Sequence, residues 1–163
     1  MKGRTFDRPR WRRLIRGMTA LVIGVMAVGA ASAVGASGAR VTSGDVQAFA
    51  LGAGLDVSGR AQMIRTADGR TIVTVHVEGL APDTAYGSHV HQQACATGEA
   101  DGHYKFDPAG PAAPPNEIWP AFTTNAAGVG NGFASVAGTA GQNAVSVVVH
   151  APGGAKIACA DLR

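Results

Sequence analysis

The sequence predicts an all-β domain, an antiparallel β-sandwich or Greek-key β-barrel of seven or eight strands, preceded by an N-terminal signal segment. Three observations support this prediction. Residues 40–163 are rich in Gly, Ala, Val and Thr and show no apolar stripe at helical spacing. Short runs of β-type residues alternate with turn signals through the same range. A basic stretch followed by an apolar run opens the chain.

The expected strands are short and separated by turn residues. Asp68-Gly69 lies between two such runs and predicts a hairpin turn, and Asn131-Gly132 marks a second candidate turn. The strands are expected at residues 46–51, 57–65, 70–78, 86–91, 119–124, 132–136 and 144–150.

Residues 1–39 have the order of parts that is typical of an export signal. A basic stretch ends at Arg16, and an apolar run covers about residues 18–33. Small residues suited to cleavage lie at Ala31-Ser32-Ala33 and Ser37-Gly38-Ala39. We therefore expect a leader at residues 1–39 and a secreted or cell-envelope domain at residues 40–163.

The export route and the fate of the leader stay open at this stage. Arg12-Arg13 fits a twin-arginine signal only in part. A permanent membrane anchor is the alternative, but the apolar run is shorter and richer in Gly and Ala than the ~20 apolar residues of a membrane span. After cleavage we expect no stable membrane association.

The basic residues of the chain are concentrated in this leader. Residues 1–39 contain seven Lys or Arg and one acid, whereas residues 40–163 contain seven bases and ten acids. The formal net charge of +3 therefore belongs to the leader. Because the remaining domain is acidic, its charge gives no support to nucleic-acid binding.

The chain has two cysteines, Cys95 and Cys159, and both lie in the exported part. An even pair in an exported chain predicts a disulfide, and two buried free thiols are the alternative. The loop closed by such a bond spans 64 residues. In the chain-entropy model, this crosslink stabilises the fold by about 4 kcal/mol.

One long segment, residues 92–117, interrupts the rhythm of strands and turns. It is rich in Gly, Ala and Pro, and it contains His103. Connections longer than ~12–15 residues without regular structure are uncommon in compact domains and usually functional. Cys95 near its start can tie this segment to the end of the chain at Cys159.

Four of the five histidines are placed so that their imidazoles can meet. His89 and His91 are two apart on a predicted strand, so they share a face, with backbones roughly 6.5–7 Å apart. His150 falls on the face of its strand that is opposite Val145, Val147 and Val149. His103 would reach over from the long segment. His76 is expected to lie on the polar side of its strand.

These four histidines predict a metal site in preference to scattered surface or core histidines. Imidazole ligation without a thiolate or a full carboxylate set favours copper, then zinc. Other families with paired strand histidines fit less well. A metallo-β-lactamase needs Asp and His directly after the pair, a cupin needs Glu three or four residues later, and an α-type carbonic anhydrase needs a chain about twice as long.

A set of short motifs follows in order along residues 46–161. In this order they resemble the landmarks of the copper–zinc superoxide dismutase family. The resemblance implies an eight-stranded Greek-key β-barrel with copper bound by four histidines and a Cys95–Cys159 disulfide. The ligands implied are His89, His91, His103 and His150. The motifs are Val57-Ser58-Gly59, Asp68-Gly69, Gly79-Leu80-Ala81-Pro82, Tyr86-Gly87-Ser88-His89-Val90-His91, Cys95, Gly102-His103, Val148-Val149-His150 and Ala158-Cys159.

The sequence departs from that family at three points. No histidine occurs between His103 and His150, so the zinc site is expected to be absent and His103 to be an ordinary copper ligand. Asp107 or Glu117 could hydrogen-bond its second nitrogen, although a solvated loop acid is the more common arrangement. The segment after His150 is too short for the family's electrostatic guiding loop. Lys156 replaces the guiding arginine, keeping the charge without the two-pronged donor.

The function implied by the resemblance is copper-dependent superoxide dismutation outside the cytoplasm, an antioxidant oxidoreductase activity. His103 would leave the reduced copper and carry a proton, and Lys156 would attract the superoxide anion. The chief alternative is a non-enzymatic copper-binding or copper-buffering protein on the same scaffold. A third is a barrel without metal that serves as an interaction module. The sequence gives no oligomeric state.

Overall fold

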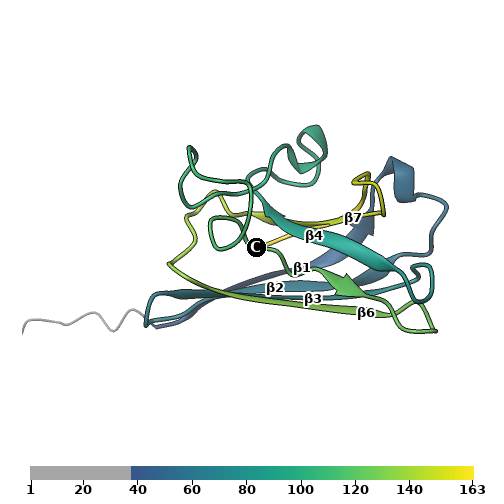
Figure 1. The fold of residues 1–163 in the computed structure, drawn as a ribbon, viewed down its shortest axis with the longest axis horizontal. Coiled ribbons are helices and arrows are strands. Elements are labelled where there is room, and N and C mark those ends of the chain that lie inside the picture. Colours follow the sequence, from purple (N-terminus) through teal and green to yellow (C-terminus); the bar gives the residue numbers. More distant parts are fainter. Residues whose placement is uncertain (1–37) are drawn as a thin grey trace, which may run out of the picture. The chain divides into compact units, whose positions relative to one another are not determined.

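The computed structural model describes residues 38–163, so the expected leader lies almost entirely outside the described residues. Eight strands and two short 3-10 helices make up this part (Figure 1). Neither helix is long and apolar enough to cross a membrane. In chain order the elements are β1 Arg40–Ala48, η1 Ala50–Gly52, β2 Ser58–Arg65, β3 Arg70–Glu78, β4 Ala85–His91, η2 Gly98–Ala100, β5 Phe122–Thr123, β6 Gly130–Ala137, β7 Ser146–His150 and β8 Lys156–Asp161.

The eight strands form one antiparallel sheet in the order β5-β4-β7-β8-β1-β2-β3-β6. The chain crosses over after β3, because β3 pairs with β6 while β4 pairs with β7. The two ends of the sheet then approach each other at glycines. A Cβ atom on Gly130 would collide with the Phe122 ring, and one on Gly132 would collide with the carbonyl oxygen of Pro120. The sheet is thus a nearly closed Greek-key barrel, which confirms the predicted fold class.

Of the two predicted turns, one is present in the structure and the other is not. The Asp68-Gly69 turn is confirmed, since residues 66–69 connect β2 to β3 and Gly69 has a φ of +82°. The turn at Asn131-Gly132 is wrong, because both residues lie inside β6. The turn before β6 instead contains Asn125, whose side chain accepts hydrogen bonds from the backbone N–H groups of Ala127 and Val129.

The strand bounds also differ from the prediction in places. The expected strand at residues 46–51 is β1, which begins earlier, at Arg40, and gives way to η1 at Ala50. The expected strand at residues 119–124 shrinks to two paired residues in β5. Strand β8 was not predicted, because four consecutive residues of it are buried and its sequence has no polar–apolar alternation.

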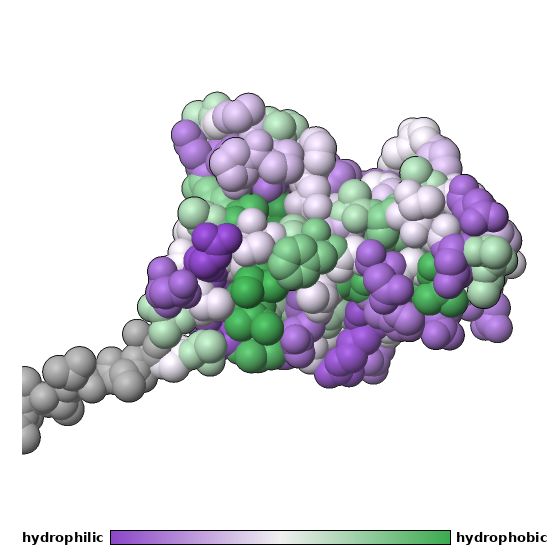
Figure 2. Space-filling view, turned by 60° about the horizontal axis from the view of Figure 1, so that its bottom comes forward, coloured by the Kyte–Doolittle hydropathy of each residue, from purple (hydrophilic) through white to green (hydrophobic). Residues whose placement is uncertain are grey.

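The barrel interior is filled mainly by alternating valines. Val73, Val75 and Val77 of β3 point into it together with Val90 of β4 and Val147 of β7. The outer surface is mixed, with polar and apolar side chains side by side in Figure 2. Because alternate residues of a strand face opposite sides, the inward valines leave their neighbours, including the histidines of β4, on the outer side.

The disulfide between Cys95 and Cys159 is present, with its Cα atoms 5.8 Å apart. It fastens the start of the long segment to β8. Around it, a small second cluster of buried residues contains Ala100 and Val148. The bond confirms the predicted pairing and is consistent with an extracytoplasmic location.

Replacing both half-cystines, in Cys95→Ala/Cys159→Ala, should lower the free energy of unfolding by about 4 kcal/mol, because the unfolded chain regains the freedom of a 64-residue loop. Urea unfolding of metal-free protein measures this loss. Wild type in strong reductant serves as the control and should unfold at the same midpoint as the variant. An unchanged midpoint in both samples would contradict the proposed role of the crosslink.

Candidate metal centre

The paired strands β4 and β7 bring three histidines together. His89 and His91 share the outer face of β4, and His150 ends β7 opposite Gly87. Together with His103 they form a group in which the nitrogen atoms available as ligands all lie within 4.8 Å of one another. The convergence predicted from the sequence is therefore confirmed, and the group has the geometry to hold a metal ion.

His103 comes from the long segment, which is fastened to β4 on both sides of this residue. The N–H of Gln92 donates to the carbonyl oxygen of Gly102 at 3.2 Å, and the N–H of Tyr104 donates to that of Val90 at 2.8 Å. Tyr104 is itself buried in the core. These contacts hold His103 against the strand although it belongs to a loop.

Backbone carbonyls determine which nitrogens of two imidazoles carry hydrogen. Nδ1 of His91 lies 3.0 Å from the carbonyl oxygen of Asp101, and Nδ1 of His150 lies 2.9 Å from that of Gly154. A carbonyl oxygen can only accept, so in the neutral rings each Nδ1 donates and each Nε2 keeps its lone pair. The two Nε2 atoms face each other at 3.3 Å. A cation bound by both lone pairs relieves the repulsion between them.

The other two imidazoles add lone pairs to the same place. Nδ1 of His103 donates to Oε2 of Glu117 at 2.7 Å, so in the neutral ring Nε2 of His103 is an acceptor. Nδ1 of His89 is buried and has no hydrogen-bond partner among the described residues. The four histidines thus offer four nitrogen lone pairs, a donor set that suits copper, zinc, iron or nickel.

The environment keeps three of the four imidazoles neutral, those of His89, His91 and His150. Burial, together with the nearby imidazoles of His103 and His150, lowers the pKa of His89 and that of His91 to about 3. Burial likewise lowers the pKa of His150. Because a metal binds the neutral form of imidazole, the site is ready for an ion at neutral pH.

Of the two candidate acids, Glu117 supports His103. Its side chain is 1 % exposed, and Nε1 of Trp119 donates to the same Oε2 atom at 2.7 Å. Burial alone raises the pKa of Glu117, but the hydrogen bonds from Trp119 and His103 outweigh it and lower that pKa. The expectation of a solvated loop acid is therefore wrong for Glu117. Asp107 does not take this role, since its Oδ1 accepts from the N–H of Ala109.

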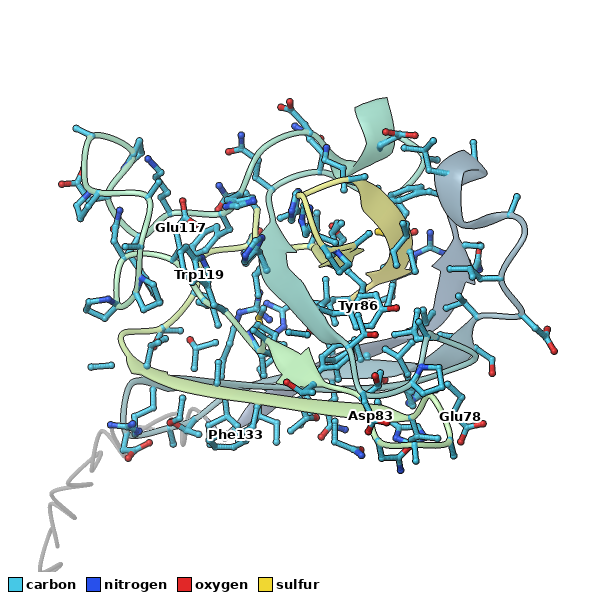
Figure 3. All side chains as sticks on the ribbon, turned by 45° about the vertical axis from the view of Figure 1, so that its right-hand side comes forward. Glu78, Asp83, Tyr86, Glu117, Trp119 and Phe133 are labelled. Atoms are coloured by element: carbon cyan, nitrogen blue, oxygen red, sulfur yellow. A yellow bond between two sulfur atoms is a disulfide. The ribbon has the colours of Figure 1, made fainter. Side chains whose placement is uncertain are left out.

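Trp119 is a residue of the site that the sequence analysis missed. Its ring centroid lies 5.0 Å from that of His89. Figure 3 shows Glu117 and Trp119 next to each other. The signal in the sequence was the alternation Glu117-Ile118-Trp119 in an extended segment, in which the apolar middle residue points to the core and both neighbours point the other way.

Lys156 fastens the backbone beside the site. Its Nζ donates to the carbonyl oxygens of Glu99 and Asp101, both at 2.8 Å. Glu99, Ala100 and Asp101 have φ values of 51°, 65° and 51°, a conformation that non-glycine residues rarely adopt. Because the Asp101 carbonyl also accepts from His91, Lys156 takes part in orienting a histidine of the group.

The fifth histidine lies apart from the group, as predicted. His76 is on the exposed face of β3 and contacts Asn131 and Glu78 through its two ring nitrogens. The group itself is open to solvent on one side, through a pocket lined by Gly87, His89, His103, His150 and residues 151–154.

Comparison with known proteins assigns no family to this geometry. No protein-family model matches the chain, and no curated protein matches it in sequence.

Lowering the pH should destabilise the metal-free protein between pH 6.5 and about 3. The unfolded chain takes up protons on its histidines below 6.5, whereas His89 and His91 stay neutral in the folded state until about 3. Each contributes a slope of roughly 1.4 kcal/mol per pH unit within this window. Urea unfolding at a series of pH values with a chelator present measures the slope. His91→Leu should flatten it, and an identical slope in that variant would contradict this account.

Proposed function

We propose that the protein is a secreted, copper-dependent superoxide dismutase that works without a zinc site. The observation that carries the proposal is the convergence of four imidazole lone pairs at an open pocket, one of them on a histidine whose second nitrogen is bonded to a buried carboxylate. The disulfide supports export.

Copper suits this donor set better than zinc does. Divalent copper binds nitrogen ligands more tightly than the other divalent first-row metals, and imidazole is a good ligand for it. Bound copper supplies a one-electron couple, which dismutation needs: one superoxide gives up an electron and becomes dioxygen, and another accepts that electron with two protons and becomes hydrogen peroxide. Zinc has no such couple.

His103 is the residue best placed to move a proton. Its Nδ1–H stays on Glu117, so its Nε2 can bind either the ion or a proton. His91 and His150 are fastened by backbone carbonyls, and both are buried. The His103 side chain is 29 % exposed and can exchange protons with solvent. We therefore assign it the role of general acid toward peroxide.

Glu117 supports the assignment of a site with one ion. It occupies the position beside Nδ1 of His103 where a second metal would have to bind a bridging imidazole. Within residues 38–163, the four histidines are also the one group of three or more His, Cys, Asp or Glu side chains whose ligand atoms converge. A carboxylate in place of the second metal keeps His103 oriented.

Purified protein loaded with copper should remove superoxide, and His103→Ala should slow this at least a hundredfold, because general acid catalysis contributes about 10²–10⁴. Copper affinity should fall by less. Pulse radiolysis gives the rate and a competing chelator gives the affinity. The variant His76→Ala, which alters a histidine outside the group, serves as the control. Tight copper binding by wild type without turnover would instead establish the copper-buffering alternative.

Lys156→Met should slow the reaction roughly tenfold at low ionic strength if the lysine attracts superoxide, since electrostatic steering of this kind raises rates by about 10–10³. Salt should shrink the difference between variant and wild type, because it screens the charge. Lys156→Arg is the matched control and should keep most of the rate. A loss that is the same at every salt concentration would show that Lys156 acts only through its hydrogen bonds to Glu99 and Asp101.

A further inference from the structure

Trp119 contacts two parts of the metal centre at once. Its indole N–H donates to Oε2 of Glu117 at 2.7 Å, and its ring lies 5.0 Å from the His89 ring, tilted by 52°. The residue is also 36 % exposed, so part of its ring faces solvent.

The local backbone explains how Trp119 reaches this position. The carbonyl oxygen of Ile118 accepts a hydrogen bond from the N–H of Val90, which lies between His89 and His91 on β4. Ile118 is fully buried in the core. With Ile118 fastened to the strand and pointing inward, its two neighbours in the chain turn toward the histidines.

We propose that Trp119 is a positioning residue of the copper centre: its N–H fixes the carboxylate that orients His103, and its ring supports His89. The inference rests on copper binding as given in the proposed function, but it does not depend on dismutase activity. It assigns to Trp119 a role in the metal's ligand geometry that reaches two of the four histidines.

The contacts of the carboxylate show why the indole N–H matters. Oε2 of Glu117 receives two donors, from His103 and Trp119, whereas Oε1 is buried and has no hydrogen-bond partner within residues 38–163. Without the indole N–H, a buried carboxylate would keep a single donor and would gain by rotating or by shifting toward solvent. The His103 ring, which is bonded to that oxygen, would move with it.

A purely apolar cover over His89 is the competing explanation. In that case the ring of Trp119 matters and its N–H does not. Trp119→Phe keeps an aromatic ring and removes the donor. Replacement of tryptophan by β-(3-benzothienyl)alanine is closer still, because sulfur takes the place of the N–H in a ring system of nearly the same shape. Because this replacement preserves the shape of the side chain, it still tests the inference if Trp119→Phe disturbs folding.

The experiment measures copper(II) affinity with a competing chelator and the copper(II) electron paramagnetic resonance spectrum. Trp119→Phe and the benzothienyl protein should each bind copper about tenfold more weakly, the lower end of the 10–100-fold effect of partners that orient ligands. Their nitrogen and copper hyperfine splittings should change. Phe133→Leu, which alters an exposed aromatic residue on β6, is the control and should match wild type.

A double-mutant cycle separates positioning through Glu117 from general packing. Glu117→Gln should weaken copper binding by a similar factor, and adding Trp119→Phe to it should cost less than a further twofold, since both changes act on one oxygen. Multiplied losses in the double variant, or wild-type affinity and spectrum in the benzothienyl protein, would overturn the inference. A protein that binds copper as expected but leaves superoxide untouched would refute only the proposed function, whereas one that takes up no copper would refute both.

Discussion

The structure of the site depends on one unfavourable interaction, the repulsion between two facing imidazole lone pairs. Nε2 of His91 and Nε2 of His150 lie 3.3 Å apart, and both are acceptors, because each ring uses its Nδ1–H on a backbone carbonyl. Left to themselves, the rings would turn apart or take up a proton. Burial opposes protonation, and the pairing of β4 with β7 opposes separation. The fold therefore holds an arrangement that a bound cation stabilises.

The facing imidazoles are held in place mostly by the backbone next to the site. Residues 99–101 all have positive φ, which costs energy for residues other than glycine. That conformation aims the Asp101 carbonyl at His91, and Lys156 bonds to the same carbonyl from β8. The disulfide fastens the preceding residues to β8 as well, and Ala100 is fully buried against that strand. The strain is thus balanced by contacts that converge on β8.

The sequence predicted the parts that depend on period and type of residue. Two-residue alternation placed His89 and His91 on one face, and an even pair of cysteines behind an expected export signal predicted their bond. What failed depended on backbone partners or on contacts far apart in sequence. The burial of β8 comes from neighbours on both sides, and the contact of Glu117 with His103 requires the long segment to fold back on itself. Every residue has a backbone carbonyl, so the residue types do not show which carbonyl, such as that of Asp101, will accept a hydrogen bond from a histidine.

The four histidines of the group differ in how firmly they are supported, and this difference bears on the proposed function. His91 and His150 are bonded to backbone, whereas His103 is bonded to a side chain that is itself held by another side chain, Trp119. Side-chain torsions yield more readily than a strand in a closed sheet. A site in which His91 and His150 are fixed by the backbone and His103 by a side chain could alter the coordination of an ion at His103 without altering the fold. The His103 side chain is 29 % exposed, so under the proposed function a change of partner at its Nε2 atom and delivery of a proton can be a single event.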